Sequence, residues 1–436
     1  MRRYLRFTLF TFAILLLAAC QDAGAPQIGL PSVAPEKVGL STDRLERIDK
    51  VMQQYVDEGR IAGAVTLVAR HGKVAHLGTY GMADIEAGKH MQANTIFRIA
   101  SMTKPITSVA VMMLYEEGHF LLSDPISKYI PEFKNPQVLV PSSTGDGYTT
   151  VPAKAEITIR QLLSHTSGIS YLFFGREYIA ELYQNASISD GLTQTEGTIG
   201  DNVRRLAGLP LYSRPGEAWG YGLSVDVLGY FIEVISGMSL DGFFRERIFK
   251  PLRMEDTYFY LPEDKISRLA SLYRPVPEGG LDEFPETPVE FGYLVMSSTY
   301  HYSGPRTYYS GGGGLVSTAS DYARFLQMMM NSGELEGVRL LSRKTVETMT
   351  TNHIGDLRSL WFGNKFSLGL GIYPDPGESG TLSSEGSYSW GGIFNTGFVV
   401  DPQEELISII MTQLYPNNQS DITAKFPVLA YQAIVD

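Results

Sequence analysis

The chain has 436 residues, 44% of them hydrophobic and 19% charged, which indicates a globular protein with a sizeable core and excludes a largely disordered one. Its formal net charge of −11 argues against partners bound through a phosphate backbone, so we expect no nucleic acid. A single cysteine excludes an intrachain disulfide, and seven scattered histidines lack the spacing of a zinc site.

The first twenty residues have the features of a targeting segment. Three arginines begin it, residues 7–17 are mostly apolar but too few for an ordinary membrane span, and small residues precede Cys20. The pattern resembles a bacterial lipoprotein signal, which implies removal of residues 1–19 and lipidation of Cys20. An ordinary secretory signal is the alternative. We therefore expect a protein of the bacterial cell envelope, anchored to a membrane through Cys20 and facing the periplasm or the exterior. Residues 20–40 contain several Gly and Pro and are predicted to form a tether.

Beyond the tether, the chain begins with a helix and a β-hairpin. Apolar residues recur every three or four positions from Leu45 to Tyr55, which predicts a helix over residues 41–58. The elements expected after it are strands over 62–69 and 74–80, helices over 101–117, 159–164, 224–236 and 240–249, strands over 367–373, 382–390, 394–400 and 406–413, and a closing helix over 421–435. Residues 135–154 and 171–211 are predicted to be mainly loops.

Strands at both ends with helices between them predict an α/β protein of the α+β type. We expect an antiparallel sheet flanked by helices, made from residues 41–108 and 290–436, with a mainly helical insert over residues 109–289. The active cleft would then lie between the two parts.

The candidate nucleophile is Ser101, in the sequence Ser101-Met102-Thr103-Lys104. Positions three apart share one face of a helix, so the amine of Lys104 can reach the hydroxyl of Ser101. A serine attacks only when a base takes its proton, and a buried lysine at a helix N-terminus has a lowered pKa. The alternative is that Ser101 simply caps the helix and Lys104 lies on the surface.

Two further segments could complete a site. Tyr221 lies in a Gly-rich stretch before a helix and could transfer protons if neighbouring cations lower its phenol pKa. Gly391 and Gly392 would let an acyl group approach the backbone, and a nearby main-chain N–H could stabilise an oxyanion together with that of Ser101. Taken alone, the first segment fits an ordinary packed aromatic better than a catalytic one, and the second fits a β-bulge or turn better than an oxyanion site.

Together the three segments resemble the serine β-lactamase and penicillin-binding protein superfamily, and most of all its class C β-lactamase-like family VIII carboxylesterases. The further stretches that match in order are 162–168, 215–217, 312–318, 321–325 and 390–392. The resemblance implies a β-lactamase/transpeptidase-like fold without metal or cofactor. It also implies an acylated Ser101, Lys104 as the base for acylation, Tyr221 sharing proton transfer, and oxyanion N–H groups from Ser101 and Ile393.

Two positions depart from the β-lactamase pattern. Trp390 stands where a lysine usually meets a substrate carboxylate and raises the positive potential near the tyrosine, neither of which a tryptophan is expected to do. Leu223 stands where an asparagine usually meets the substrate's amide. Both changes favour a less charged acyl group, and Tyr171, Phe173 and Phe174 could wall an apolar acyl pocket or merely pack in a loop.

The leading hypothesis is a serine hydrolase acting on carboxylic esters through an acyl-enzyme. The alternatives are a DD-carboxypeptidase-like peptidase on D-amino-acid peptides, a weak β-lactamase, an acyltransferase, and a catalytically silent envelope binding protein. The partner expected is therefore a small-molecule ester or peptide. His165 is expected to support a loop rather than act as a base, and Asp321 to cap a helix over residues 322–330.

Overall fold

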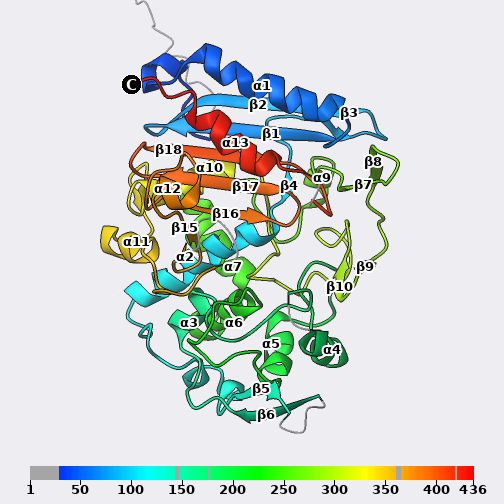
Figure 1. The fold of residues 1–436 in the computed structure, drawn as a ribbon, viewed down its shortest axis with the longest axis vertical. Helices are drawn as coiled ribbons and strands as arrows, with labels where there is room; N and C mark the ends of the chain where they lie inside the picture. Colours follow the sequence, from blue (N-terminus) through cyan, green and yellow to red (C-terminus); the bar gives the residue numbers. More distant parts are fainter. Residues whose placement is uncertain (1–28, 143–146, 175–176, 360–364, 418–419) are drawn as a thin grey trace, which may run out of the picture.

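An antiparallel sheet with helices on both faces forms one part of the molecule, and a helical region is attached to it (Figure 1). This computed structural model describes residues 29–142, 147–174, 177–359, 365–417 and 420–436. Within them the sheet has eight strands, all paired antiparallel. In spatial order they are β14 (Lys365–Phe366), β15 (Gly371–Ile372), β16 (Tyr388–Gly392), β17 (Thr396–Asp401), β18 (Leu406–Met411), β1 (Gly63–Arg70), β2 (Lys73–Asp84) and β3 (Lys89–His90). The predicted fold class is confirmed.

The remaining elements fall into two groups. Those beside the sheet are α1 (Thr42–Asp57), β4 (Phe97–Arg98), α2 (Thr103–Glu116), β11 (Val316–Ser317), α10 (Ala319–Met330), β12 (Glu334–Leu335), β13 (Val338–Arg339), α11 (Arg343–Met349), α12 (Pro376–Ser379) and α13 (Ile422–Tyr431). Those of the intervening region are β5 (Gln137–Pro141), β6 (Tyr148–Pro152), α3 (Ile159–Leu163), α4 (Glu177–Asn185), α5 (Ile199–Ala207), α6 (Ser224–Ser236), α7 (Leu240–Phe244), the π-helical turn Arg245–Phe249, α8 (Lys250–Leu252), α9 (Glu263–Ile266), β7 (Tyr273–Pro275), β8 (Leu281–Glu283), β9 (Val289–Phe291) and β10 (Leu294–Met296).

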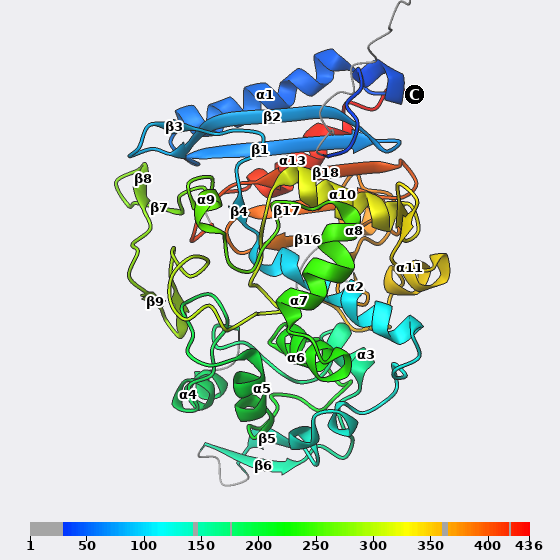
Figure 2. The same cartoon turned by 180° about the vertical axis from the view of Figure 1, so that it is seen from behind.

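Strand β1 is buried along its whole length because each face of the sheet packs against different helices. Val65 and Leu67 join the main core with α2 and α10, whereas Ala64 and Val68 join a second core under α1 and α13. Figure 1 shows α13 in front of the sheet, and Figure 2 shows α10 in front of it from the other side. A strand covered on both faces has a mostly apolar sequence, as residues 62–69 have, with Thr66 as the one polar side chain.

The short pair β4–β11 places the start of α2. Arg98 pairs with Val316, and the N–H of Ile99 donates to the carbonyl of Leu315 at 3.1 Å. A single 3₁₀ turn, Ala100–Met102, then leads into α2. Candidate residues Ser101 and Lys104 therefore lie where the sheet part meets the helical region.

Several predicted elements differ from the structure. Residues 135–154 were expected to be a loop, yet they form the hairpin β5–β6, in which Val138 pairs with Val151. Of the strand expected over 367–373 only residues 371–372 form a strand, β15, because Gly369, with φ +96°, turns the chain between β14 and β15. The predicted boundary at residue 108 falls inside α2, whose two ends pack in one core. The predicted cap Asp321 lies inside α10, which Thr318 caps instead.

The predicted tether is partly wrong as well. Residues 1–28, including the expected signal and Cys20, lie outside the described residues. From Gly29 onward the chain packs on the domain: Val33 and Val74 share a hydrogen bond of 2.9 Å, and Leu30 and Leu40 are buried. Burial of these apolar side chains holds the segment in place.

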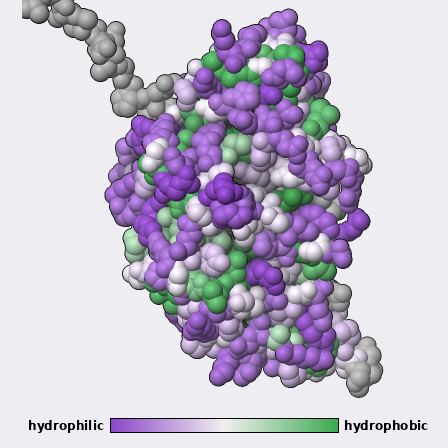
Figure 3. Space-filling view, turned by 90° about the vertical axis from the view of Figure 1, so that its left-hand side faces the viewer, coloured by the Kyte–Doolittle hydropathy of each residue, from purple (hydrophilic) through white to green (hydrophobic). Residues whose placement is uncertain are grey.

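The surface is mainly polar. On the face drawn in Figure 3, hydrophilic residues predominate and hydrophobic ones form small separate patches. Within the described residues no single helix is long and apolar enough to cross a membrane, although α6 and the helix 240–252 pass that test as a pair bent by 79°.

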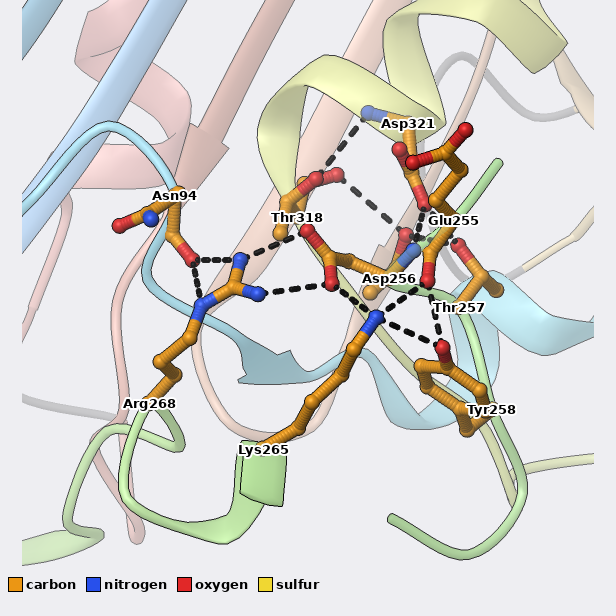
Figure 4. Close-up of polar contacts among 10 residues, drawn as sticks. Asn94, Glu255, Asp256, Thr257, Tyr258, Lys265, Arg268, Thr318 and Asp321 are labelled. Carbon is orange, nitrogen blue, oxygen red and sulfur yellow. Dashed lines mark hydrogen bonds and ion pairs between the residues drawn. The ribbon is translucent and has the colours of Figure 1, made fainter. Parts of the chain in front are cut away.

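A cluster of charges supports β11 from outside the sheet (Figure 4). The carboxylate of Asp256 accepts hydrogen bonds from Lys265 at 2.8 Å and from Arg268 at 2.6 Å. The backbone N–H of Asp256 donates to the buried carboxylate of Asp321 on α10 at 2.7 Å. Two residues further on, the backbone of Tyr258 pairs with Val316 in β11. The cluster thus stabilises the strand pair β4–β11, and β4 directly precedes the turn that carries Ser101.

We predict that Asp256→Asn lowers the free energy of unfolding by about 2 kcal/mol at pH 7, because two half-buried cations lose their charged partner. Burial raises the pKa of Asp256, but the hydrogen bonds from Arg268 and Lys265 outweigh it, so the pKa lies below its ordinary value of 3.8. The contribution is therefore present at neutral pH and lost as the pH falls through the lowered pKa. Urea denaturation of both proteins at pH 7 measures it.

The matched control is Asp282→Asn, which removes an exposed carboxylate 3.6 Å from Arg274. We expect it to cost less than about 0.5 kcal/mol. Equal losses in the two variants would show that the Asp256 cluster does not stabilise the fold.

Candidate active site

Ser101 and Lys104 lie on adjacent turns at the start of α2. Their side chains approach to 3.2 Å between Nζ and Oγ, as the spacing predicted. Ala100, directly before the serine, has φ +42°, a strained value for a residue with a side chain. Ser101 is half-buried and Lys104 is fully buried. The serine hydroxyl can therefore meet a ligand while the amine stays out of water.

The amine of Lys104 has three polar contacts. Besides Ser101, Nζ donates to the hydroxyl of Tyr171 at 2.9 Å and to the carbonyl of Gly312 at 2.6 Å. Burial lowers the pKa of Lys104 to about 7, although the carboxyl groups of Asp226 and Asp190 act in the opposite direction. A large share of the amine is thus neutral at pH 7 and can accept a proton.

Tyr221 lies across the nucleophile from α2. Its ring centroid is 4.6 Å from Nζ of Lys104, and its hydroxyl hydrogen-bonds to Ser101. The sequence allows proton transfer by this tyrosine if neighbouring cations lower its phenol pKa. The structure contradicts this, because burial raises the pKa of Tyr221, and hydrogen bonds from Ser101 and Trp390 offset only part of that rise. Tyr221 therefore remains a neutral phenol, able to pass a proton on rather than to hold a negative charge.

Trp390 contacts Tyr221 directly. Its indole Nε1–H donates to the Tyr221 hydroxyl at 3.2 Å, and the two ring centroids are 5.4 Å apart. Sequence alone did not predict this hydrogen bond. The indole supplies a hydrogen-bond donor in the place of a lysine but brings no positive charge.

Gly391 and Gly392 end β16, beside the 3₁₀ turn of the nucleophile, and Ile393 follows them. A side chain on Gly392 would meet the carbonyl oxygen of Ile99 at 2.4 Å, so only glycine permits this approach. Ile393 begins the turn to β17 and packs in an apolar cluster with Ala100. The chain segments that carry the two expected oxyanion N–H groups therefore lie next to each other.

Three polar groups of the site were not identified from the sequence. The hydroxyl of Tyr171 and the carbonyl of Gly312 accept hydrogen bonds from Lys104. The N–H of Gly312 in turn donates to the carboxylate of Asp226 at 3.4 Å. The run of glycines from Gly311 to Gly314 was a signal of close backbone approach. A side chain on Gly312 would meet Asp226 at 2.3 Å. Asp226, inside a regular helix pattern, gave no such signal.

His165, which the sequence analysis expects to support a loop, is surrounded by aromatic rings. His165 is fully buried among Trp219, Tyr221 and Phe366, and neither ring nitrogen has a hydrogen-bond partner among the described residues. Burial, reinforced by Lys104, lowers its pKa well below the ordinary value, so the ring is neutral.

Leu223 is fully buried at the start of α6. The rings of Tyr171 and Phe173 stack at 4.9 Å between centroids, with Phe174 against them. No group of three or more His, Cys, Asp or Glu among the described residues is placed to hold a metal ion.

Comparisons with known proteins cover most of the chain. The family model described as Beta-lactamase matches residues 48–432. Esterase EstB of Burkholderia gladioli is 33% identical over 373 residues, which cover 84% of this chain and 89% of EstB. A putative D-alanyl-D-alanine carboxypeptidase of Escherichia coli O157:H7 is 27% identical, with 97% and 96% covered. The solved structure of EstCE1, titled a hydrolase with promiscuous acyltransferase activity, has a TM-score of 0.77 and 28% identity, with 89% and 99% covered.

We predict that a serine-directed fluorophosphonate labels Ser101 at a rate that rises with pH through about 7 and levels off above it. Lys104, whose pKa is about 7, must be deprotonated to take the hydroxyl proton. Below pH 7 the rate should fall about tenfold per pH unit, as measured by mass spectrometry of the labelled protein. The same rate at pH 5 and pH 9 would exclude Lys104 as the base.

Proposed function

The chain belongs to the beta-lactamase family and is a serine hydrolase, and we propose that it hydrolyses carboxylic esters through an acyl-enzyme on Ser101. The observation that carries the proposal is the 3.2 Å hydrogen bond from the indole of Trp390 to Tyr221. It supports the proton-transferring tyrosine without placing a cation at the position that would otherwise meet a substrate carboxylate.

Acylation begins with the neutral amine of Lys104, 3.2 Å from the nucleophile. As the Oγ of Ser101 attacks the ester carbonyl carbon, its proton passes to Nζ, and the carbonyl oxygen becomes an oxyanion. The N–H groups of Ser101 and Ile393 would donate to that oxyanion. The bond to the leaving alcohol then breaks, and the alkoxide takes a proton from Tyr221, which regains it from Lys104.

Deacylation repeats these steps with water in place of the alcohol. Lys104 and Tyr221 remove a proton from the water, whose oxygen attacks the acyl carbon. The bond to Oγ then breaks, and the proton returns to Ser101. The products are one carboxylic acid and one alcohol, and the enzyme is restored. The contacts of Nζ with Tyr171 and Gly312 hold the amine in place through both halves of the reaction.

The surroundings of Ser101 support an ester with an uncharged acyl chain. Ala100, Leu192 and Phe394 form a buried apolar cluster, against which Phe173 and Ile393 pack. EstB is named an esterase and EstCE1 a hydrolase, which agrees with this substrate class. The named carboxypeptidase relative keeps a D-alanyl peptide as the alternative substrate, and Trp390 opposes it, since no positive charge stands there for a terminal carboxylate.

We predict that kcat/KM for p-nitrophenyl butyrate exceeds that for a D-alanyl-D-alanine peptide and for a cephalosporin by at least about 100-fold. Ser101→Ala should lower ester hydrolysis by about 1,000-fold or more, because no other group can form the acyl-enzyme. Release of p-nitrophenolate, of D-alanine and of the opened β-lactam measures the three reactions.

The matched control is Ser108→Ala, which removes a buried hydroxyl from the same helix that has no hydrogen-bond partner among the described residues. It should retain ester hydrolysis within about twofold. Peptide hydrolysis faster than ester hydrolysis would overturn the proposed substrate class, and turnover by Ser101→Ala would overturn the nucleophile.

We also propose that Cys20 carries a lipid anchor that keeps the domain at a bacterial membrane, facing the periplasm or the exterior. Support for this comes from the sequence before Cys20 and from its being the one cysteine of the chain. The first described residue, Gly29, binds the domain through its carbonyl, which accepts from Arg324 at 3.1 Å. At most eight residues, 21–28, would then separate the anchor from the folded domain.

We predict that the full chain, made in a Gram-negative host supplied with an alkyne-labelled fatty acid, incorporates the label and sediments with membranes. Cys20→Ala should incorporate none, because the thioether cannot form, and should lose its membrane association. Equal labelling of both proteins would contradict the anchor.

A further inference from the structure

Asp226, in the first turn of α6, is a fully buried carboxyl group that takes no part in the proton transfers of acylation. Its Oδ1 accepts hydrogen bonds from the hydroxyl of Ser310 at 2.7 Å and from the N–H of Gly312 at 3.4 Å. Its Oδ2 is buried and has no hydrogen-bond partner among the described residues. An asparagine would accept the same two hydrogen bonds without burying a negative charge, so hydrogen bonding alone does not explain a carboxylate here.

The backbone that Asp226 contacts is fixed between two helices. In the peptide unit that joins Gly311 to Gly312, the carbonyl accepts from the hydroxyl of Thr107 on α2 at 2.7 Å, and the N–H donates to Asp226 on α6. A side chain on Gly311 would come within 2.8 Å of the carbonyl oxygen of Val225, so glycine lets this segment lie directly against α6. The position of the peptide unit therefore depends on both helices.

The carbonyl of Gly312 determines how the neutral amine of Lys104 points. A neutral amine has two N–H donors and one lone pair. A backbone carbonyl can only accept, so the 2.6 Å contact with Gly312 uses one N–H, and the 2.9 Å contact with the hydroxyl of Tyr171 uses the other. The lone pair then remains for Ser101, whose Oγ is 3.2 Å from Nζ. A displaced Gly312 would free one N–H and leave the lone pair without a fixed direction.

The charge of Asp226 acts on the same amine. Burial lowers the pKa of Lys104, and the carboxyl groups of Asp226 and then of Asp190 oppose that fall. Burial raises the pKa of Asp190 well above its ordinary value. It raises the pKa of Asp226 as well, but the hydrogen bond from Ser310 and the charge of Lys104 offset part of that rise. The other titratable groups that face Lys104 or Asp226 are neutral at pH 7, and they are His165, Tyr171, Tyr221 and Tyr308.

We infer that Asp226 is a positioning residue for acylation, whose carboxylate holds Gly312 where its carbonyl aims the lone pair of Lys104 at the nucleophile. The inference rests on the proposed acyl-enzyme on Ser101 and adds to it a residue that acts only through other groups. The negative charge of Asp226 also raises the pH at which the lone pair becomes available, because it favours the charged amine. Replacing the carboxylate should therefore change both the rate of attack by Ser101 and the pH dependence of that rate.

Two variants separate the charge of Asp226 from its hydrogen bonds. Asp226→Asn keeps an acceptor oxygen for Gly312 and loses the charge, whereas Asp226→Ala loses both. The rate at which a fluorophosphonate labels Ser101 is measured from pH 5 to pH 9. Asp226→Asn should move the midpoint of this profile at least about half a unit to lower pH, and keep the plateau within about tenfold of the unmodified chain. Asp226→Ala should lower the plateau at least about 100-fold, because the amine is no longer held in line.

The matched control is Glu233→Gln, which removes a second carboxylate from α6, in the last turn of the helix. Glu233 accepts from the N–H of Leu240 at 2.9 Å, as the amide also can. Its midpoint should not move, and its plateau should stay within about twofold. An unmoved midpoint in Asp226→Asn would overturn the inference, and so would an equal shift in Glu233→Gln or an Asp226→Ala plateau within twofold. If Asp226→Ala does not fold, the midpoint of Asp226→Asn decides.

Titration of Lys104 keeps the inference separate from the proposed substrate. The ¹³Cε NMR signal of Lys104 follows its protonation without any substrate, and its midpoint should also be lower in Asp226→Asn. If p-nitrophenyl butyrate is not hydrolysed but the labelling and NMR midpoints both move, the ester proposal fails and the role of Asp226 stands. Ester hydrolysis with neither midpoint moved would remove the role of Asp226 alone.

Discussion

The amino group of Lys104 has to lose its charge inside the protein, and most features of the site either lower its pKa or keep the neutral amine hydrogen-bonded. Burial disfavours the ammonium strongly enough to bring its pKa to about 7, and three oxygen atoms, on Ser101, Tyr171 and Gly312, keep the amine hydrogen-bonded in either state. The carboxyl groups of Asp226 and Asp190 limit the fall of the pKa. A lysine with fewer partners would cost more stability, and one with a direct ion pair would stay charged.

Burying Lys104 requires cover from elements that are distant in the sequence. Helix α2 carries it, α6 and the tyrosines Tyr171 and Tyr221 cover it from the helical region, and the backbone at Gly312 closes it from the chain that leads to β11. Strand β16 then brings Trp390 to Tyr221. The site therefore forms only where the two parts of the molecule meet. Because β11 pairs with β4 just before Ser101, the charges around Asp256 support the site from a distance.

Sequence alone predicts the parts of this arrangement that have a local cause. The i, i+3 spacing places Lys104 beside Ser101, and the β-rich residues 62–69 predict the strand that becomes β1. The sequence could not predict contacts between side chains that come from distant parts of the chain. The hydrogen bond from Trp390 to Tyr221 joins residues 169 positions apart, and the one from Lys104 to Tyr171 joins residues 67 positions apart. The raised pKa of Tyr221 is likewise a consequence of burial, which no local pattern reports.

The central claim is that burial lowers the pKa of Lys104 to about 7, so that about half of the amine is neutral at pH 7, and its titration tests this most directly. Lysine labelled with ¹³C at Cε gives one NMR signal per residue, and the Lys104 signal is the one missing from Lys104→Met. The account predicts that this signal titrates with a midpoint near pH 7, well below the ordinary lysine value of 10.5. A midpoint near 10.5 for Lys104 would contradict it, because the amine would then be charged and unable to activate Ser101.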